Sequence, residues 1–183
     1  MGRPRQPEDA KLIIGILAKN KKLFDDVEEF FIDAFGAIDY RSEILPFDYT
    51  DYYKKEMGET LSRKFVSFKK LIRPGDLAKI KLRTNSIEEK FAAEKEGAVR
   101  RLINIDPGYI TDAKLVLATT KDYSHRIYLR KGIYAEVTLA WRKGGFQALD
   151  WTYPDYRTRE YIDILNRMRD SYAKQTKGIS KKD

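Results

Sequence analysis

Three side chains in the second half of the chain have the chemistry for acid–base catalysis. His125 is the single histidine of the sequence, and an imidazole exchanges a proton near neutral pH. Asp122 lies three positions earlier, where it could orient the imidazole across a tight turn, and Glu136 follows on the next predicted strand. This set predicts a hydrolase or transferase that acts on a phosphorylated substrate, with His125 as acid or base. The alternative is a structural histidine, which is the commoner role of a lone imidazole.

A second group of side chains predicts anion binding. Between residues 103 and 157, arginine and lysine are interspersed with tyrosine and tryptophan, and such residues clamp phosphate and stack on bases. The predicted ligand is therefore a nucleotide or RNA. Two residues three apart on a predicted helix, Asn85 and Glu88, are predicted to support the site. The predicted binding residues of the segment are Asp106, Tyr109, Lys121, Arg126, Tyr134, Thr138, Tyr153, Asp155, Tyr156 and Arg157.

A metal site is a further alternative. Hard divalent cations prefer carboxylate oxygens, and Glu136 is the central candidate ligand. Its partners would be Asp106, Asp122 or Asp155. Their spacing matches no ligand code comparable to an EF-hand loop, so the cofactor stays open, with a divalent cation as one alternative. Residues 48–56 also gather acids and aromatics, and this loop is predicted to cover the sheet edge rather than to close over a ligand.

The composition excludes several classes of site. The chain has no cysteine, so a disulfide framework, a thiolate nucleophile and Cys-ligated zinc are all excluded, and a reducing cytosol is the expected location. The net charge of +8 is uneven, because residues 1–60 carry −4 and residues 61–183 carry +12. The positive part favours phosphate-bearing partners. Basicity that serves only solubility would give the same count.

The hydrophobic pattern predicts the elements that must position these residues. Apolar residues at helical spacing follow Asn20 and Asp76, which are predicted N-caps, and a third such segment follows Thr158. Together with the strands, these helices predict an α+β fold: a mainly antiparallel sheet of about six strands with three helices packed on it. The predicted strands are residues 11–17, 37–45, 61–68, 100–105, 114–119, 125–130 and 133–141.

Residues 125–141 are predicted to form a β-hairpin with one apolar and one polar face, because neighbouring side chains on a strand alternate. Ile127 and Leu129 are expected in the core. A three-residue loop at residues 131–133 is favoured over a two-residue turn, because it keeps the polar side chains on one face. That face is either a working site or a solvated surface with weak ion pairs. It holds Arg126, Tyr128, Arg130, Tyr134, Glu136 and Thr138, with Tyr128 opposite Glu136 and Arg126 opposite Thr138.

Residues 11–175 are predicted to form one domain, between a flexible arm at residues 1–10 and a basic flexible tail at residues 176–183. The arm lacks the apolar segment of a signal peptide, and no apolar stretch is long enough to span a bilayer. A cytoplasmic protein without a membrane partner is expected. Within the domain, residues 106–108 (Asp-Pro-Gly) are predicted to form a turn, because proline presets φ and glycine accepts positive φ.

Several motifs are distinctive: LPF at 45–47, YY at 52–53, EMG at 56–58, DPGY at 106–109, LATTKD at 117–122, HRIYL at 125–129, GIYAEVTL at 132–139 and WTYPDYR at 151–157. They resemble an uncharacterised prokaryotic family that is catalogued as a domain of unknown function, and the resemblance spans nearly the whole chain. Members of that family are sometimes labelled GTP-binding proteins, so the resemblance implies nucleotide binding. The phosphate-binding loop of GTP-binding proteins is absent, since residues 15–19 lack its second glycine and its hydroxyl.

Overall fold

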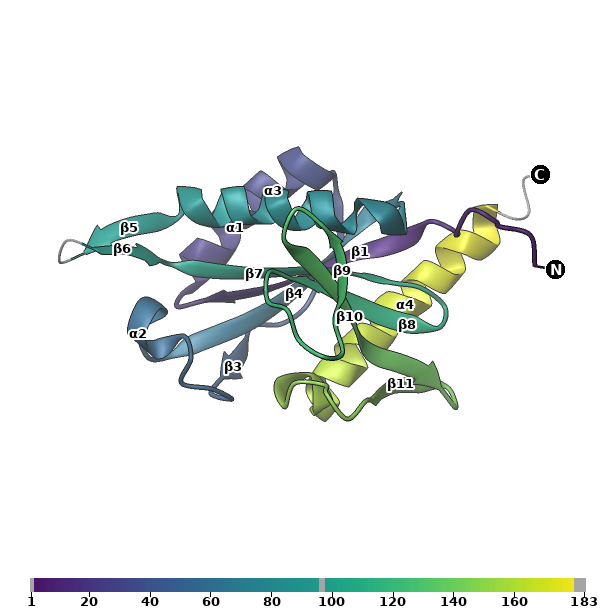
Figure 1. Ribbon diagram of the computed structural model, residues 1–183. Helices are drawn as coiled ribbons and strands as arrows, with labels where there is room; N and C mark the ends of the chain where they lie inside the picture. Colours follow the sequence, from purple (N-terminus) through teal and green to yellow (C-terminus); the bar gives the residue numbers. More distant parts are fainter. Residues whose placement is uncertain (1, 96–97, 180–183) are drawn as a thin grey trace.

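The computed structural model describes residues 2–95 and 98–179 (Figure 1). In these residues nine strands form one antiparallel sheet, in the order β11–β10–β8–β7–β1–β4–β2, with β3 beside β4 and β9 beside β10. β5 and β6 form a separate ribbon. The strands are β1 (Ala10–Ala18), β2 (Ile38–Arg41), β3 (Leu45–Phe47), β4 (Leu61–Ile72), β5 (Ala92–Lys95), β6 (Ala98–Arg101), β7 (Ile103–Ile110), β8 (Lys114–Thr119), β9 (Ile127–Arg130), β10 (Ile133–Arg142) and β11 (Gly145–Ala148).

The predicted α+β class with a mainly antiparallel sheet is confirmed, whereas the prediction of about six strands is too low. Two of the additional strands in this sheet are short, since β3 has three residues and β11 has four. So few residues give no periodic hydrophobic signal. The predicted strand at 37–45 is also divided, because β2 and β3 are separate strands that pair with different parts of β4.

Three long helices pack on the sheet within the described residues. α1 (Lys21–Phe35) and α3 (Leu77–Lys90) cover one face, and α4 (Arg159–Ile179) covers the other (Figure 1). β1 lies between the two layers and is buried along its whole length. Its residues Leu12 and Ile14 pack towards α1 and α3, and Ile13 packs towards α4. A strand that is covered on both faces has a continuous apolar sequence, which is why residues 11–17 could be predicted.

The helix ends largely follow the predicted caps. Asn20 Oδ1 accepts a hydrogen bond from the Leu23 amide at 3.1 Å, and α1 begins there. Thr158 Oγ1 accepts from the Tyr161 amide at 3.4 Å at the start of α4. Asp76 occupies the N-cap position of α3 without a side-chain hydrogen bond to the helix. The remaining short helices are α2 (Lys54–Met57), η1 (Pro74–Asp76) and η2 (Asp155–Arg157).

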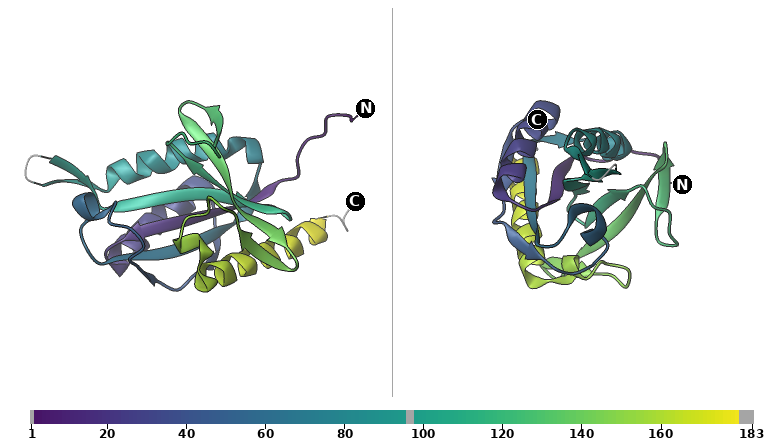
Figure 2. Two further views of the ribbon diagram at one scale, coloured as in Figure 1. Left: turned by 60° about the horizontal axis from the view of Figure 1, so that its bottom comes forward. Right: turned by 90° about the vertical axis from the view of Figure 1, so that its left-hand side faces the viewer.

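The sheet opens between β7 and β8. β7 pairs with β1 along its whole length, but its pairing with β8 extends only from Gly108 to Ile110. β8 continues past Leu117 to Thr119 and pairs there with β10 instead. The two strands therefore diverge, and β8 and β10 turn away from β7 (Figure 2). We call the space between the unpaired parts of β7 and β8 the fork.

Asp106, Pro107 and Gly108 lie inside β7, so the turn predicted for them is wrong. Two residues before the proline, the Ile105 amide points into the fork, where it donates to a helix side chain. Pro107 has its nitrogen at the same edge because strand residues two apart face the same way. Among the described residues no strand pairs with that edge at this point, so the missing N–H costs no ladder hydrogen bond.

Gly108→Ala is expected to destabilise the protein by about 2–3 kcal/mol. A Cβ atom at this position would lie 2.4 Å from the carbonyl oxygen of Val116, and that main-chain atom is fixed by the β7–β8 pairing. Denaturant unfolding followed by circular dichroism measures the loss. The control is Gly75→Ala, where a Cβ would meet no atom within 4 Å, and its stability should stay within about 0.5 kcal/mol of the wild type. Equal stabilities of the two variants would contradict the close approach.

The β9–β10 turn differs from the prediction. Lys131 and Gly132 have φ angles of 51° and 73°, as in a two-residue type I′ turn, so the predicted three-residue loop is wrong. A bulge at Leu129 in β9 then shifts the register, and Tyr128 pairs with Tyr134 rather than with Glu136. A regular two-residue turn would mix apolar and polar side chains on one face of the hairpin, and this bulge removes that conflict. The alternation of residues along a single strand does not reveal a bulge.

β9 lies outside the core. Ile127 is 71% exposed and Leu129 is 39% exposed, so the prediction that both join the core is wrong. In β10 two polar residues are buried as deeply as the apolar Ile133 and Leu139, because Glu136 is 3% exposed and Thr138 is fully buried. A second bulge between Val137 and Leu139 changes the face that β10 presents. Glu136 and Thr138 therefore do not belong to a solvated surface, whereas Tyr128 and Arg130 of the predicted polar face are exposed, as in the alternative prediction.

The structure describes most of the predicted arm and about half of the predicted tail. Residues 2–9 contain no helix or strand, and residue 1 lies outside the described residues. Residues 176–179 of the predicted tail belong to α4, and residues 180–183 lie outside the described residues. In the described part of the chain, no helix combines the length and the apolar character needed to cross a membrane.

Candidate functional site

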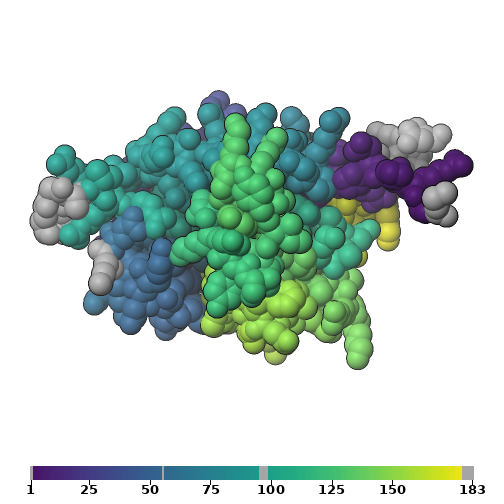
Figure 3. Space-filling model, in the orientation of Figure 1, coloured from purple at the N-terminus to yellow at the C-terminus, as the bar shows by residue number. Residues whose placement is uncertain are grey.

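A pocket of about 840 Å³ occupies the fork. β7 and α3 form one side of it, and the end of β8, the loop that follows and β10 form another. The segment that contains β3 and α2 closes the third side, and it lies next to the β8–β10 region on the face seen in Figure 3. The volume is in the range of small-molecule binding sites. Its three sides come from parts of the chain that lie far apart in the sequence.

Arg63 of β4 lies at the bottom of the pocket and is 2% exposed. Its Nη1 donates to Oδ2 of Asp106 at 2.9 Å, and its Nη2 donates to Oδ2 of Asp155 at 3.3 Å. Asn104 Nδ2 also donates to Oδ2 of Asp106, at 3.0 Å. A buried guanidinium requires such partners, because an unpaired buried charge is strongly destabilising. We call Arg63, Asp106 and Asp155 the floor of the pocket.

The two floor carboxylates have opposite pKa shifts. Burial alone would raise the pKa of Asp106, but Arg63 and Lys81 outweigh it and hold that pKa below its ordinary value. For Asp155 burial dominates, and Arg63 compensates only in part, so its pKa is raised. The negative charge of Asp106 adds to the increase. At equal pH, Asp155 therefore retains its proton more readily than Asp106 does.

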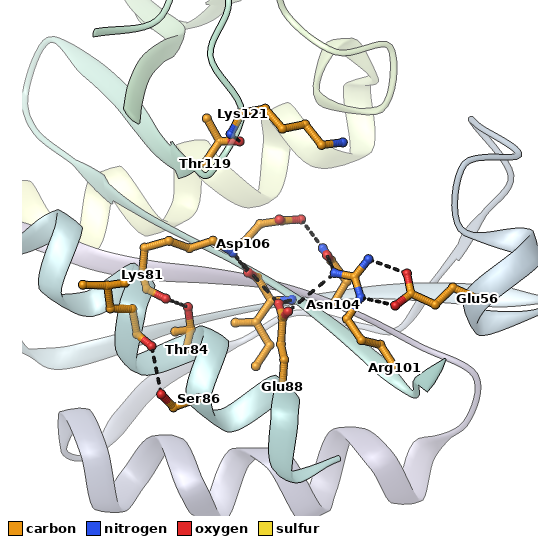
Figure 4. Close-up of polar contacts among 12 residues, drawn as sticks. Glu56, Lys81, Thr84, Ser86, Glu88, Arg101, Asn104, Asp106, Thr119 and Lys121 are labelled. Carbon is orange, nitrogen blue, oxygen red and sulfur yellow. Dashed lines mark hydrogen bonds and ion pairs between the residues drawn. The ribbon is translucent and has the colours of Figure 1, made fainter. Parts of the chain in front are cut away.

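Two residues of α3 satisfy the free edge of β7 (Figure 4). The Ile105 amide donates to Glu88 Oε1 at 2.6 Å, and Lys81 Nζ donates to the Ile105 carbonyl oxygen at 2.7 Å. These side chains take the place of a paired strand, since buried main-chain groups need partners. Burial raises the pKa of Glu88, and Lys81, whose Nζ lies 4.0 Å away, partly opposes that increase.

Arg101 of β6 connects this edge to α2 (Figure 4). Its Nε and Nη2 donate to the two carboxylate oxygens of Glu56 at 2.7 and 2.6 Å, which is the bidentate geometry that guanidinium favours. Its Nη1 lies 3.3 Å from Asn104 Oδ1 and 3.5 Å from Glu88 Oε2. These contacts hold the segment around α2 against the wall of the fork.

Glu136 forms a second buried charge centre on β10. Its Oε2 accepts from Arg126 Nε at 2.8 Å and lies 3.2 Å from His125 Nε2. Its Oε1 accepts from Thr138 Oγ1 at 3.3 Å. Arg126 Nη2 also donates to the hydroxyl of Tyr153 at 2.5 Å. Glu136, Arg126 and Tyr153 all line the pocket.

His125 supports Glu136 from outside the pocket. Its ring stacks on Trp151, with centroids 5.5 Å apart and planes 13° apart, and the indole Nε1 is fixed by donation to the Val137 carbonyl oxygen at 2.8 Å. Among the described residues Asp122 makes no hydrogen bond to His125, and it is exposed. The structure thus brings His125 together with Glu136 but not with Asp122.

Exposed aromatic rings and one lysine form the mouth of the pocket, which we define as Tyr49, Tyr52, Tyr153 and Lys121. The three tyrosines are 37%, 57% and 46% exposed, and Lys121 Nζ lies 3.9 Å from the centroid of the Tyr52 ring. Lys121 has no carboxylate within ion-pair distance in the described residues, whereas the other basic residues of the pocket do. Those paired residues are Arg63, Lys81, Arg101 and Arg126.

The residues predicted from the sequence divide into two groups. Nine of them line the pocket among the described residues: Asn85, Glu88, Asp106, Lys121, Arg126, Glu136, Tyr153, Asp155 and Tyr156. The others lie elsewhere. Tyr109 borders a smaller hollow beside Pro74, Tyr134 packs edge-on against Tyr128, and Thr138 is buried behind Glu136. Arg157 donates to the main-chain carbonyl oxygens of residues 149, 150 and 152 and holds that loop.

Sequence reasoning missed several pocket residues. Arg63 follows an ordinary strand pattern, and nothing local shows that it is buried. Lys81 and Arg101 were not singled out either, because their local sequence does not distinguish them from solvated charges. Two signals could have found part of the third side: the family motifs, which contain Phe47, Tyr52, Tyr53 and Glu56, and the acidic and aromatic loop at residues 48–56. That loop was predicted to cover the sheet edge, and its side chains line the pocket. Asn104 is among the other residues that were missed.

Comparison with known proteins gives a family but no relative of known function. Neither the curated proteins nor the solved structures contain a match to the chain. The family model described as "Domain of unknown function (DUF4416)" matches residues 8–172. The chain therefore belongs to the DUF4416 family, which confirms the predicted resemblance to an uncharacterised family.

Proposed function

We propose that the pocket in the fork binds a free nucleotide, with the base towards the aromatic residues and the phosphate at Lys121. The observation that carries this proposal is the mouth, where three partly exposed tyrosines surround a lysine that lacks a carboxylate partner among the described residues. Tyrosine rings stack on bases, and each such contact contributes about 1–3 kcal/mol. Lys121 supplies the charge that a phosphate requires.

The enclosed shape favours a free nucleotide over RNA. The pocket has a floor and three sides, and its volume of about 840 Å³ suits a ligand of nucleotide size. RNA-binding surfaces are open grooves along which several bases stack in succession. Among the described pocket residues, the basic side chains other than Lys121 are neutralised by carboxylates. A long phosphate backbone would therefore find few free cations here.

Lys121→Met is expected to weaken nucleotide binding about tenfold or more, because a charge-assisted hydrogen bond contributes roughly 1.5–3 kcal/mol. Isothermal titration calorimetry with ribonucleoside mono- and triphosphates measures the affinity. Arg130→Met is the matched control, since it removes one positive charge from exposed β9 outside the pocket. Its affinity should equal that of the wild type. Equal weakening in both variants would show general attraction of anions, and absence of binding by every nucleotide would overturn the proposal.

A further inference from the structure

The floor holds two carboxylates in one place with different tendencies to keep a proton. Asp106 and Asp155 are bound by the two terminal nitrogens of one guanidinium, that of Arg63, and both line the pocket. The pKa of Asp155 is raised and that of Asp106 is lowered. Two neighbouring carboxyl groups, one with a raised pKa and one with a lowered pKa, can supply a general acid and a general base at the same pH.

A buried hydroxyl beside this pair has no partner. Tyr156 is 2% exposed and lines the pocket, and its hydroxyl makes no hydrogen bond within the described structure. A Cβ atom at Gly15 would lie 3.2 Å from this hydroxyl and 3.0 Å from Arg63 Nη1, so the hydroxyl and the guanidinium border the same space over Gly15. Buried hydroxyls are normally paired. A ligand oxygen that reaches the floor would supply the missing acceptor.

The charges of the floor decide which reaction suits it. Phosphoryl transfer needs cations that are available to the equatorial oxygens, but Arg63 is committed to Asp106 and Asp155, and Lys81 to Ile105 and Glu88. Cleavage of a glycosidic bond passes through a transition state with positive charge on the sugar, and it uses a pair of carboxyl groups. The floor therefore fits glycosidic cleavage better than phosphoryl transfer.

We propose that the pocket hydrolyses the glycosidic bond of its nucleotide, with Asp155 as general acid and Asp106 as general base; this rests on the nucleotide binding proposed above. Asp155 gives its proton to the departing base as the bond from the sugar to the base nitrogen breaks. Asp106 takes a proton from the water whose oxygen bonds to the anomeric carbon. The products are the free base and the sugar phosphate, and solvent returns the proton from Asp106 to Asp155. The hydroxyl of Tyr156 donates to a sugar oxygen.

The test measures release of free base from the four common ribonucleoside 5′-monophosphates by chromatography, with the full chain. Asp155→Asn and Asp106→Asn are expected to lower the rate by about 100-fold to 10,000-fold. Tyr156→Phe removes only the unpartnered hydroxyl, so it should keep the wild-type Tm while lowering the rate about tenfold. Asp33→Asn, on the exposed surface of α1, is the control and should keep the full rate. The wild-type rate should fall towards low pH as Asp106 gains a proton, and fall again as the pH rises and Asp155 loses one.

The outcomes separate this inference from the proposed binding. If calorimetry shows nucleotide binding but no base is released between about pH 4 and pH 8, the hydrolysis is wrong and the binding stands. Base release at an undiminished rate in Asp155→Asn would overturn the assignment of the acid. If the two aspartate variants do not fold, Tyr156→Phe and the wild-type pH profile decide the matter: a full rate in that variant, or a rate independent of pH, contradicts the proposal. Absence of both binding and release overturns the proposed function as well.

Discussion

Arg63→Met is expected to destabilise the protein by about 3–5 kcal/mol at pH 7. The side chain is 2% exposed, and it is the cation that separates Asp106 from Asp155. Methionine fills similar space but leaves the buried carboxylate of Asp155 and the partly buried carboxylate of Asp106 without that cation. Urea unfolding gives the difference from the wild type. Arg130→Met, on exposed β9, is the control and should change stability by less than about 0.5 kcal/mol.

The loss in Arg63→Met should shrink as the pH falls from 7 towards about 4. In the wild type the pKa of Asp106 is lowered, so its contribution to stability is present above the unfolded-state value and is lost as the pH falls through the lower folded-state value. Without Arg63, burial raises the folded-state pKa of both carboxyls, and the folded variant takes up protons first as the pH falls. A loss that is independent of pH, or smaller than about 1 kcal/mol, would contradict the buried triad.

Arg126→Met is expected to cost about 2–4 kcal/mol, because it leaves the carboxylate of Glu136 buried without its cation. Glu136 is 3% exposed, and Arg126 Nε is its closest partner at 2.8 Å. If the lost stability arises from the unpaired carboxylate of Glu136, adding the substitution Glu136→Gln should recover part of that stability. The double variant is therefore expected to be more stable than Arg126→Met alone. A double-mutant cycle by urea unfolding measures this coupling, and strictly additive losses would contradict it.

The sequence allowed prediction of elements whose signal is local. The apolar run of β1, the cap at Asn20 and the three-four spacing that begins at Leu77 all predicted elements that the structure contains. The register of the β9–β10 hairpin was not predictable in this way, because one bulge in β9 shifts the pairing and another in β10 changes the face that β10 presents. The turn proposed for residues 106–108 failed because the edge of β7 is satisfied from α3, and local turn preferences carry no information about that helix.

The candidate site was predictable only in part, and for the same reason. Asp106 and Asp155 lie in the segment singled out from the sequence, but Arg63, which joins them, lies 43 and 92 positions away from them. Long-range pairing of this kind leaves no local pattern. His125, the single histidine, was predicted to act as an acid or base, yet the structure places it behind Glu136. The pocket depends on the divergence of β7 and β8, which is a property of the sheet and of no single strand.

The most direct test of nucleotide binding in the fork is an NMR titration of the full chain with the four ribonucleoside 5′-monophosphates, followed at the amide resonances. Binding at the mouth and floor predicts saturable shifts at Asn104, Thr119 and Lys121, which line the pocket, and none at exposed β9 residues such as Arg130. Lys121→Met should weaken the titration. Shifts spread over basic residues outside the pocket, or no shifts with any of the four nucleotides, would contradict the account.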